Sequence, residues 1–283
     1  MSTSDHTIAT SWEECDEKIR SIEEENAGSL TGVWFRGLSS ARWLLTTTLE
    51  RRRKEPFFVG EYYDLMLRTL PEVETFTGQR WDGEALKWSD PKKRFAEYFP
   101  ASPAFSYMAH LRHHGFPSPL LDWTRSPYIA AYFAFAGTQP KPGENVAIFA
   151  YSEMPNNSKS TASNKPQICT HGGYGLRTHA RHFRQQSCYT VCVERVEPSA
   201  PHLALESAWR FVRHQQVFVH RDEEQDKLYK IEIPSTERTK VLAMLDRFNL
   251  NDFSLFGSEE SLMESLAFRW IDKNGRAAAP LGE

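Results

Sequence analysis

An arginine and a glycine at the end of a short apolar run, residues 33–35, are the first residues whose types suggest chemistry. Arg36 presents a rigid fork of donors that matches a phosphate or a pair of ribose hydroxyls, and Gly37 would let a ligand approach the backbone closely. The alternative is an arginine that caps the strand end or pairs with an internal carboxylate. In the first interpretation, the pair predicts an anion-binding site at a strand end.

A carboxylate in an apolar run is the second feature. Asp122 stands between Leu121 and Trp123, where an ionised side chain is costly unless it is paired or hydrogen-bonded. Its expected partners are Arg36, Arg51 or the backbone donors at the start of the helix that follows. We expect Asp122 to brace a pocket more than to take part directly in catalysis.

Hydroxyl and amide side chains form a third group. Thr124 and Ser126 precede the same helix, where they would cap it or hydrogen-bond a ribose or carboxamide. Gln186, at the head of a later strand, would orient a nucleophile or a 2′-hydroxyl, although an amide cannot stabilise a cation as a carboxylate does. If a carboxylate is required, Glu194 and Asp122 are the alternatives. Because all three groups lie at strand ends, we expect them to face one cavity.

Histidine and cysteine side chains are frequent between residues 169 and 192, but their spacings match no standard zinc motif. We therefore expect no metal site. His113 and His114 end a predicted helix, where partial negative charge favours a protonated imidazole, so a helix cap and a ligand contact are both open for them. The sequence also lacks the P-loop, Rossmann and nucleophile-elbow motifs.

The composition bounds the class of protein. The 283 residues are 40% hydrophobic and 25% charged, which is typical of a globular fold, and the net charge of −3 argues against nucleic-acid binding through bulk charge. The first residues do not resemble a signal peptide, and no stretch approaches the roughly 18 apolar residues of a membrane span. We therefore expect a soluble cytoplasmic protein, with no membrane association and with its four cysteines reduced.

Hydrophobic periodicity predicts both helices and strands. Helices are predicted at residues 11–26, at 57–99 with breaks at Pro71 and Pro91, at 102–115, from 127 onward, and at 235–249 and 258–269. Strands are predicted at residues 30–37, 120–123, 146–151, 188–193 and 228–233. Residues 203–218 mix both signals. Residues 152–178 lack an apolar period, so we expect a long mobile loop there.

Three stretches resemble the FRG domain family, which is named for its Phe-Arg-Gly triplet. They are VWFRGLSS at 33–40, followed by Trp43 and the LER of 49–51; HHGFPSPLLDWT at 113–124, continuing through SPYIAAYFA at 126–134; and RHFRQQSCYT at 181–190. The resemblance covers residues 30–270 in the expected order. The chain departs from it at Ser118-Pro119, where members usually carry Thr-Arg, and at Arg112, where they carry Gln. Arg112 and Arg125 are the candidate substitutes for the lost arginine.

FRG domains resemble, in turn, ADP-ribosyltransferases, in which an arginine or histidine on an early strand holds NAD and a late glutamate or glutamine guides transfer. This resemblance implies an α+β fold with mixed or antiparallel central sheets and flanking helices. It implies catalytic roles for Arg36, Gln186 and Asp122. The contacts with NAD that it implies are those of Arg36, Gly37, His113, Thr124, Arg125, Ser126, Tyr132 and Gln185.

The resemblance also divides the chain, into an N-terminal helical extension at 1–29, an FRG domain at 30–270 and a flexible tail at 271–283. It implies transfer of ADP-ribose from NAD to RNA or protein, by a toxin or effector of bacterial antiphage defence or of a toxin–antitoxin locus, with an antitoxin protein as a further partner. The loop 152–178, with Lys159, Lys165 and Arg177, would contact the acceptor. The alternatives are a non-catalytic module that binds nucleotides or nucleic acid, and an NAD hydrolase.

Overall fold

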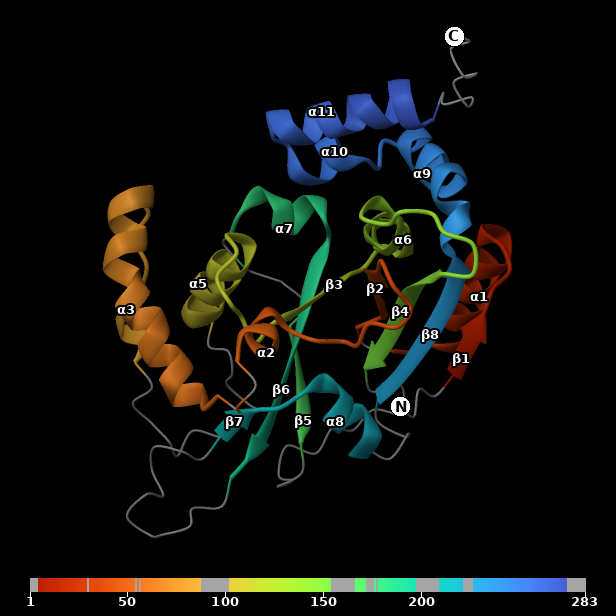
Figure 1. Ribbon diagram of the computed structural model, residues 1–283. Coiled ribbons are helices and arrows are strands. Elements are labelled where there is room, and N and C mark those ends of the chain that lie inside the picture. The colour runs from red at the N-terminus through yellow and green to blue at the C-terminus, as the bar shows by residue number, and fades with distance from the viewer. Residues whose placement is uncertain are drawn as a thin grey trace.

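The computed structural model describes residues 5–29, 31–53, 55, 57–87, 102–153, 166–171, 176, 178–196, 209–220 and 226–273. These residues form an eight-stranded sheet flanked by helices (Figure 1). The strand order is β1-β8-β4-β2-β3-β6-β5, and β7 pairs with β6. In the described residues β1 is parallel to β8, and the other pairs are antiparallel. The expected α+β class, with a mixed and mostly antiparallel sheet, is therefore confirmed.

The strands of the sheet are β1 (Asp5–Ile8), β2 (Val33–Leu38), β3 (Leu121–Thr124), β4 (Asn145–Glu153), β5 (Gln167–His171), β6 (Ser187–Arg195), β7 (Trp209–Phe211) and β8 (Asp226–Pro234). The helices are α1 (Trp12–Glu25), α2 (Thr48–Arg52), α3 (Val59–Thr77), α5 (Ser102–His113), α6 (Pro127–Ala136), α7 (Ala180–Arg184), α8 (His214–His220), α9 (Arg238–Arg247), α10 (Asp252–Phe256) and α11 (Glu259–Ala267).

Side chains along each strand alternate between the two faces of the sheet, so the core consists of separate hydrophobic clusters. On β2, Phe35 packs with α1, α6 and α9 on one face, while Trp34 packs with β3 and β6 residues on the other. A third cluster joins α3 and α5 to β6, and Figure 1 shows these two helices at the opposite side of the sheet from α1 and α9. Because side chains of a strand alternate between faces, Arg36 lies on the Trp34 side of β2 and Gly37 on the Phe35 side.

The sheet separates between β2 and β3. These strands share a single paired position, Phe35 with Thr124, whereas β2 pairs with β4 at six positions from Val33 to Leu38. Beyond Phe35, toward Leu38, the backbone of β3 therefore has no partner in β2. A buried carbonyl left in this way needs another donor, so the separation requires a polar side chain between the strands.

The N-terminal segment is more than a helical extension. The helix predicted at 11–26 is confirmed as α1, with Ser11 as its cap, but β1 was not predicted. β1 pairs with β8, and α1 buries Cys15 and Ile19 in the core that it shares with α6 and α9. Residues 5–25 therefore belong to the main sheet and core. Most of the tail predicted to be flexible, residues 274–283, lies outside the described residues.

Two further expectations are corrected. Helix α3 continues through Pro71, because its N-terminal half is fixed by buried side chains such as Tyr62 and Met66 and can tolerate one missing hydrogen bond. Pro91 lies outside the described residues. Residues 152–178 are not a single loop: 152–153 continue β4, 167–171 form β5, and Leu176 is buried. Residues 154–165, 172–175 and 177 are outside the described part. No described helix has the length and apolarity to cross a membrane.

Gly37 lies where β2 meets α6. A Cβ atom built on it would lie 1.9 Å from the carbonyl oxygen of Ala130 and 2.6 Å from the backbone nitrogen of Ala134. Backbone atoms cannot move aside as the end of a flexible side chain can, so the glycine is what allows this close approach. The backbone that comes close to Gly37 is thus that of α6, and the glycine is required whether or not a ligand binds.

We predict that Gly37→Ala strongly destabilises the fold, because overpacking against backbone costs about 1–3 kcal/mol or more. Thermal unfolding followed by circular dichroism measures the effect. The matched control is Gly28→Ala, whose new Cβ would meet no atom within 4 Å. Equal melting temperatures for the two variants would contradict the packing role of Gly37.

Candidate functional site

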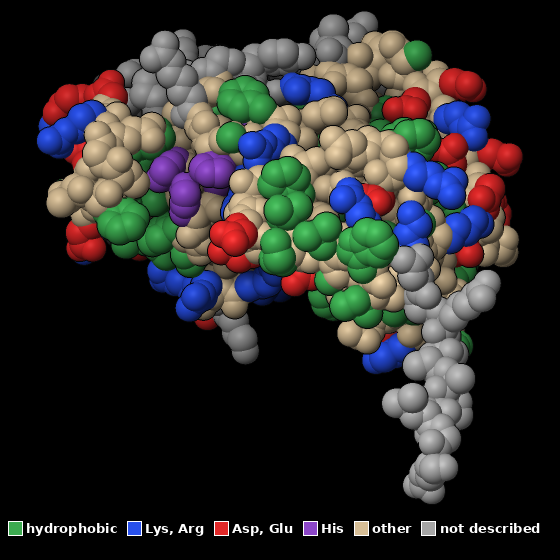
Figure 2. Space-filling view, turned by 90° about the horizontal axis from the view of Figure 1, so that it is seen from above, with side chains coloured by type: hydrophobic (Ala, Val, Ile, Leu, Met, Phe, Trp, Pro, Cys, Tyr) green, Lys and Arg blue, Asp and Glu red, His purple; other side chains and the backbone are tan. Residues whose placement is uncertain are grey.

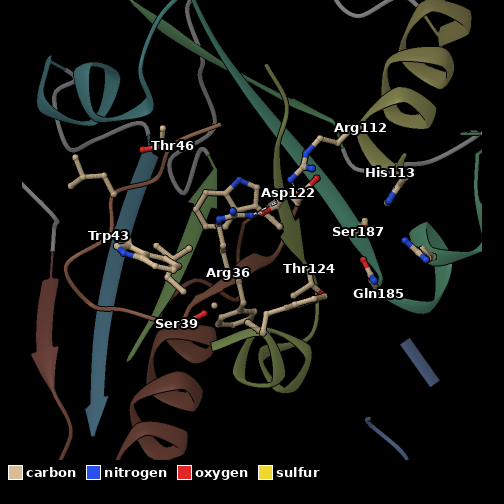
Figure 3. A pocket seen from close by; sticks show the side chains of 18 of the residues that line it. Arg36, Ser39, Trp43, Thr46, Arg112, His113, Asp122, Thr124, Gln185 and Ser187 are labelled. Atoms are coloured by element: carbon tan, nitrogen blue, oxygen red, sulfur yellow. Dashed lines mark hydrogen bonds and ion pairs between the residues drawn. The ribbon is translucent and has the colours of Figure 1, made fainter. Parts of the chain in front are cut away.

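A cavity of about 770 Å³ opens where β2 and β3 separate. The loop after β2, the short helix α2, the end of α5, β3, α6 and α7 all contribute to its wall. Figure 3 shows Arg36 near its centre, with Trp43 on one side and Asp122, Arg112, His113 and Gln185 on the other. The polar lining consists of Arg36, Ser39, Arg42, Thr46, Arg51, Arg112, His113, Asp122, Thr124, Arg181, Gln185 and Ser187.

Arg36 bridges the separated strands. Its Nη1 donates a hydrogen bond of 2.5 Å to the carbonyl oxygen of Asp122 and lies 3.9 Å from the Asp122 carboxylate. Arg112, from the last turn of α5, donates to the same carboxylate. Arg36 was an expected partner of Asp122 and is confirmed. The other partner is Arg112, which was not expected. Asp122 thus braces β2, β3 and α5 at the floor of the cavity.

The lining has an excess of positive charge. Among the described residues it contains five arginines, at positions 36, 42, 51, 112 and 181, and one carboxylate, Asp122. Burial lowers the pKa of Arg36 to about 10; Asp122 opposes the shift, and Arg112 and Arg51 reinforce it. Arg36 nevertheless remains charged at neutral pH. Since Asp122 is already engaged by two arginines, the cavity favours an anionic ligand.

Three of these arginines hold unused donors. The Nε atoms of Arg36, Arg112 and Arg181 are buried and have no hydrogen-bond partner in the described structure. A buried donor without an acceptor costs about 1–3 kcal/mol. The oxygens of a phosphate group are acceptors that match the guanidinium fork.

Helices α2 and α7 position two of the other arginines. A capping box between Thr47 and Glu50 fixes α2, and Arg51 donates to the carbonyl oxygen of Thr47 across 3.4 Å. Arg181, in the first turn of α7, lies 5.4 Å from the ring centroid of Phe256. Arg51 therefore approaches the cavity from a capped helix, and the Arg181 guanidinium is itself positioned by the Phe256 ring.

A buried hydrogen-bonded chain starts at His113. Its Nε2 lies 2.8 Å from the Tyr189 hydroxyl, which lies 3.0 Å from Nδ1 of His182. The hydroxyl has one proton, so it donates to one imidazole and accepts from the other. Burial lowers the pKa of His113 to about 4, against the opposing effect of Asp122. His113 therefore faces the cavity as a neutral imidazole at pH 7, and the protonated helix cap is not formed.

His214 is buried close to Arg36. It is fully inaccessible, and its Nε2 lies 2.8 Å from the Thr190 hydroxyl, which also accepts from the Trp123 indole. Burial lowers the pKa of His214 to about 3, and the charge of Arg36 acts in the same direction. A neutral His214 thus adds no further positive charge beneath the cavity.

Thr124 and Ser126 have the capping roles considered for them. Thr124 lines the cavity and accepts from the backbone nitrogen of Ser126, and Ser126 accepts from that of Ile129 as the cap of α6. Ser126 itself does not line the cavity. Neither does Arg125, whose backbone nitrogen donates to the carbonyl oxygen of Gln186. Of the two candidate substitutes for the missing family arginine, Arg112 lies in the cavity.

Of the two glutamines expected at the site, Gln185 lines the cavity and Gln186 does not. Gln186 has a φ of 48°, and this left-handed turn leaves it exposed and outside the cavity. Gln185, the C-cap of α7, lines the cavity as expected of a predicted NAD contact, and its amide nitrogen donates a 3.4 Å hydrogen bond to the carbonyl oxygen of Leu255. Tyr132 is also outside the cavity, because it is buried in the core around α6. The expectation that all three motifs face one cavity holds for Arg36, Thr124 and Gln185.

Histidine side chains gather on the face seen in Figure 2. Ring contacts join His110 to His114, with centroids 4.4 Å apart, and His114 to His179, with centroids 5.3 Å apart. Even so, the described residues contain no group of three or more His, Cys, Asp or Glu side chains that could hold a metal ion. This surface group therefore gives no support to a metal site.

We predict that the free energy of unfolding falls as the pH drops below about 6.5. The pKa of His214 is near 3 in the folded protein, so the unfolded chain binds its proton first, and stability declines from about pH 6.5 toward pH 3. One such group contributes about 1.4 kcal/mol per pH unit. Urea unfolding at several pH values should give a shallower decline for His214→Asn than for the parent. The control is His114→Asn, at an exposed position, and an identical slope for all three proteins would refute the assignment.

Comparison with known proteins supports the family. Residues 31–142 match the family model described as FRG domain, and this segment includes β2, α2, α5, β3 and α6 of the cavity wall. No curated protein and no solved structure matches the chain. The matched segment, which contains Arg36 and Asp122 of the cavity floor, is similar to an FRG domain, as the first two sequence motifs indicated.

Proposed function

We propose that the cavity binds NAD and that the protein transfers ADP-ribose from NAD to a macromolecule. The observation that carries this proposal is the charge of the lining, five arginines against one engaged carboxylate. The pyrophosphate of NAD carries two negative charges and accepts hydrogen bonds on every side, so it matches such a lining. A volume of about 770 Å³ also lies within the usual range of small-molecule sites.

The deep arginines would hold the pyrophosphate. Arg36 and Arg112 are fixed by Asp122, and each has an Nε donor without a partner. A ligand oxygen close to them would gain charge-assisted hydrogen bonds with little loss of side-chain entropy, because both side chains are already ordered. This preorganisation favours Arg36 and Arg112 over the exposed Arg42 for the first contact with the ligand.

In the transfer, the bond between C1′ of the ribose and the nicotinamide nitrogen breaks, and nicotinamide leaves with the bonding electron pair. The acceptor atom attacks C1′ and gives up its proton. Gln185 lines the cavity, and its amide nitrogen donates to the carbonyl oxygen of Leu255. This hydrogen bond orients the amide, so that its oxygen can accept a hydrogen bond from the acceptor or from a ribose hydroxyl. The proton leaves to solvent, and His113, a neutral imidazole of the described lining whose pKa is lowered to about 4, is a weak base that can relay it. A toxin or effector role in bacterial conflict remains the biological context of this proposal.

A second function is favoured by one observation. Asp122 is the carboxylate of the described lining, and both Arg36 and Arg112 neutralise it. A cationic transition state then has no free carboxylate beside it, which suits a module that binds a nucleotide or nucleic acid without catalysis. Incubation of the protein with NAD labelled in its adenosine part, with and without cell lysate, separates the possibilities. Label on a macromolecule supports transfer, free ADP-ribose supports hydrolysis, and unchanged NAD supports a binding module.

We predict that Arg36→Ala lowers the affinity for NAD at least tenfold, since removal of a charged hydrogen bond costs about 1.5–3 kcal/mol. The fold should survive with a lowered melting temperature, because the Asp122 carbonyl oxygen loses its donor while the Asp122 carboxylate keeps its contact with Arg112. Calorimetric titration with NAD and thermal unfolding are to be measured on the same preparation. Arg20→Ala, at a remote and exposed arginine of α1, serves as the control. Loss of melting temperature without loss of affinity in the folded fraction would assign Arg36 a purely structural role.

A further inference from the structure

The loop between β2 and α2 presents three consecutive exposed side chains at the cavity. Arg42, Trp43 and Leu44 all line it, and the exposed fractions of Trp43 and Leu44 are 58% and 52%. An exposed tryptophan beside an exposed leucine leaves apolar surface in contact with water, which is unfavourable unless a partner covers it. In the described part of the chain, no other aromatic ring packs against Trp43.

The exposure of this tripeptide is built into the loop. On its N-terminal side, the backbone of Ala41 is held by Asn145 and Lys230, with hydrogen bonds of 2.8 Å each. On its C-terminal side, Leu45 is buried in the core at 1% exposure, and Thr47 begins the capping box of α2. Both ends of the loop are thus fixed, and the three residues between them are displayed on the surface.

The charge around the tripeptide selects the class of partner. Arg42 belongs to it, and Arg51 lines the same cavity from α2. The only carboxylate of the described lining, Asp122, is occupied by Arg36 and Arg112. A partner must therefore be negatively charged and must also offer flat apolar surface to an indole ring. Unpaired nucleotides combine these properties, because each base has a π-face and each phosphate a negative charge.

We propose that Trp43 stacks on an unpaired base of single-stranded nucleic acid, with Arg42 and Arg51 contacting the flanking phosphates. The inference rests on the proposed function in one respect: the strand held here would be the acceptor of ADP-ribose. Figure 3 shows Trp43 across the cavity from Asp122 and Arg112, so a base on the indole would lie at the opposite wall from the arginines that would hold NAD. In this arrangement the base and NAD would lie at opposite walls of the same cavity.

The test measures strand binding without NAD, so that it stays informative even if NAD does not bind. Fluorescence anisotropy with labelled single-stranded RNA and DNA of about 12 nucleotides gives the affinities. Trp43→Ala should weaken binding about tenfold or more, and Trp43→Phe, which keeps a ring, should restore most of it. Trp270→Ala is the matched control, at a tryptophan that is 73% exposed on the C-terminal segment. The affinity should also fall as the salt concentration is raised, because the phosphates release their counterions when the strand binds to the arginines.

Two outcomes would overturn the inference. The first is equal strand affinity in the parent and in Trp43→Ala, with unchanged melting temperature. The second is a loss of NAD affinity in Trp43→Ala that equals the loss of strand affinity, which would show that the indole stacks on a ring of NAD. Label from NAD that protease removes and nuclease does not would identify a protein acceptor, and would also count against the proposal. Strand affinity that depends on Trp43 in a protein with no NAD binding would support it and reject the transferase function.

Discussion

The site depends on the hydrogen bond from Arg36 to the carbonyl oxygen of Asp122, which takes the place of backbone pairing between β2 and β3. β2 and β3 pair at Phe35 and Thr124, but the residues of β3 that precede Thr124 have no partner in β2. The guanidinium of Arg36 supplies the missing donor for the Asp122 carbonyl oxygen. A buried carbonyl without a donor costs about 1–3 kcal/mol, so the strands can separate only where a side chain reaches into the gap. Because the same side chain also contacts the carboxylate that Arg112 binds, the floor of the cavity and its charge have a common origin.

That arrangement places like charges close together in the unliganded protein. The whole chain has a net charge of −3, yet the described lining of the cavity contains five arginines. The lowered pKa of Arg36 reflects the burial of its charge and the nearby cations. Neighbouring groups limit the repulsion: Asp122 is shared by two arginines, and His113 and His214 stay neutral because burial lowers their pKa values. An anion that enters would relieve the remaining repulsion between the arginines. Part of its binding free energy would therefore come from removal of this repulsion, which destabilises the unliganded protein.

The elements with their own hydrophobic period were predictable from sequence, and those that depend on partners were not. The apolar runs of β2, β3, β4, β6 and β8 and the amphipathic face of α1 were predicted because their side chains must be buried. β1 and β5 have only four and five residues, and their pairing with β8 and β6 supplies most of what defines them. Which glutamine lines the cavity depends on a single left-handed turn at Gln186. Arg42 and Arg181 were missed as cavity residues because a charge in a loop or at a helix end carries no period that predicts its position.

The cavity wall has two kinds of support, and they suit different steps of binding. Arg36 and Arg112 are held by the backbone carbonyl and the carboxylate of Asp122, so their geometry is fixed before a ligand arrives. Trp43 lies between Ala41, whose carbonyl oxygen accepts from Lys230, and the buried Leu45, and its own side chain is 58% exposed. A fixed floor favours one small ligand of defined shape, since misplacement of a reacting atom by about 1 Å is expensive in catalysis. An exposed aromatic rim tolerates different bases in one place, because stacking depends little on which base is present. The division between a fixed floor and an exposed rim therefore matches the proposed function, in which one small donor is recognised strictly and the acceptor only by its chemical class.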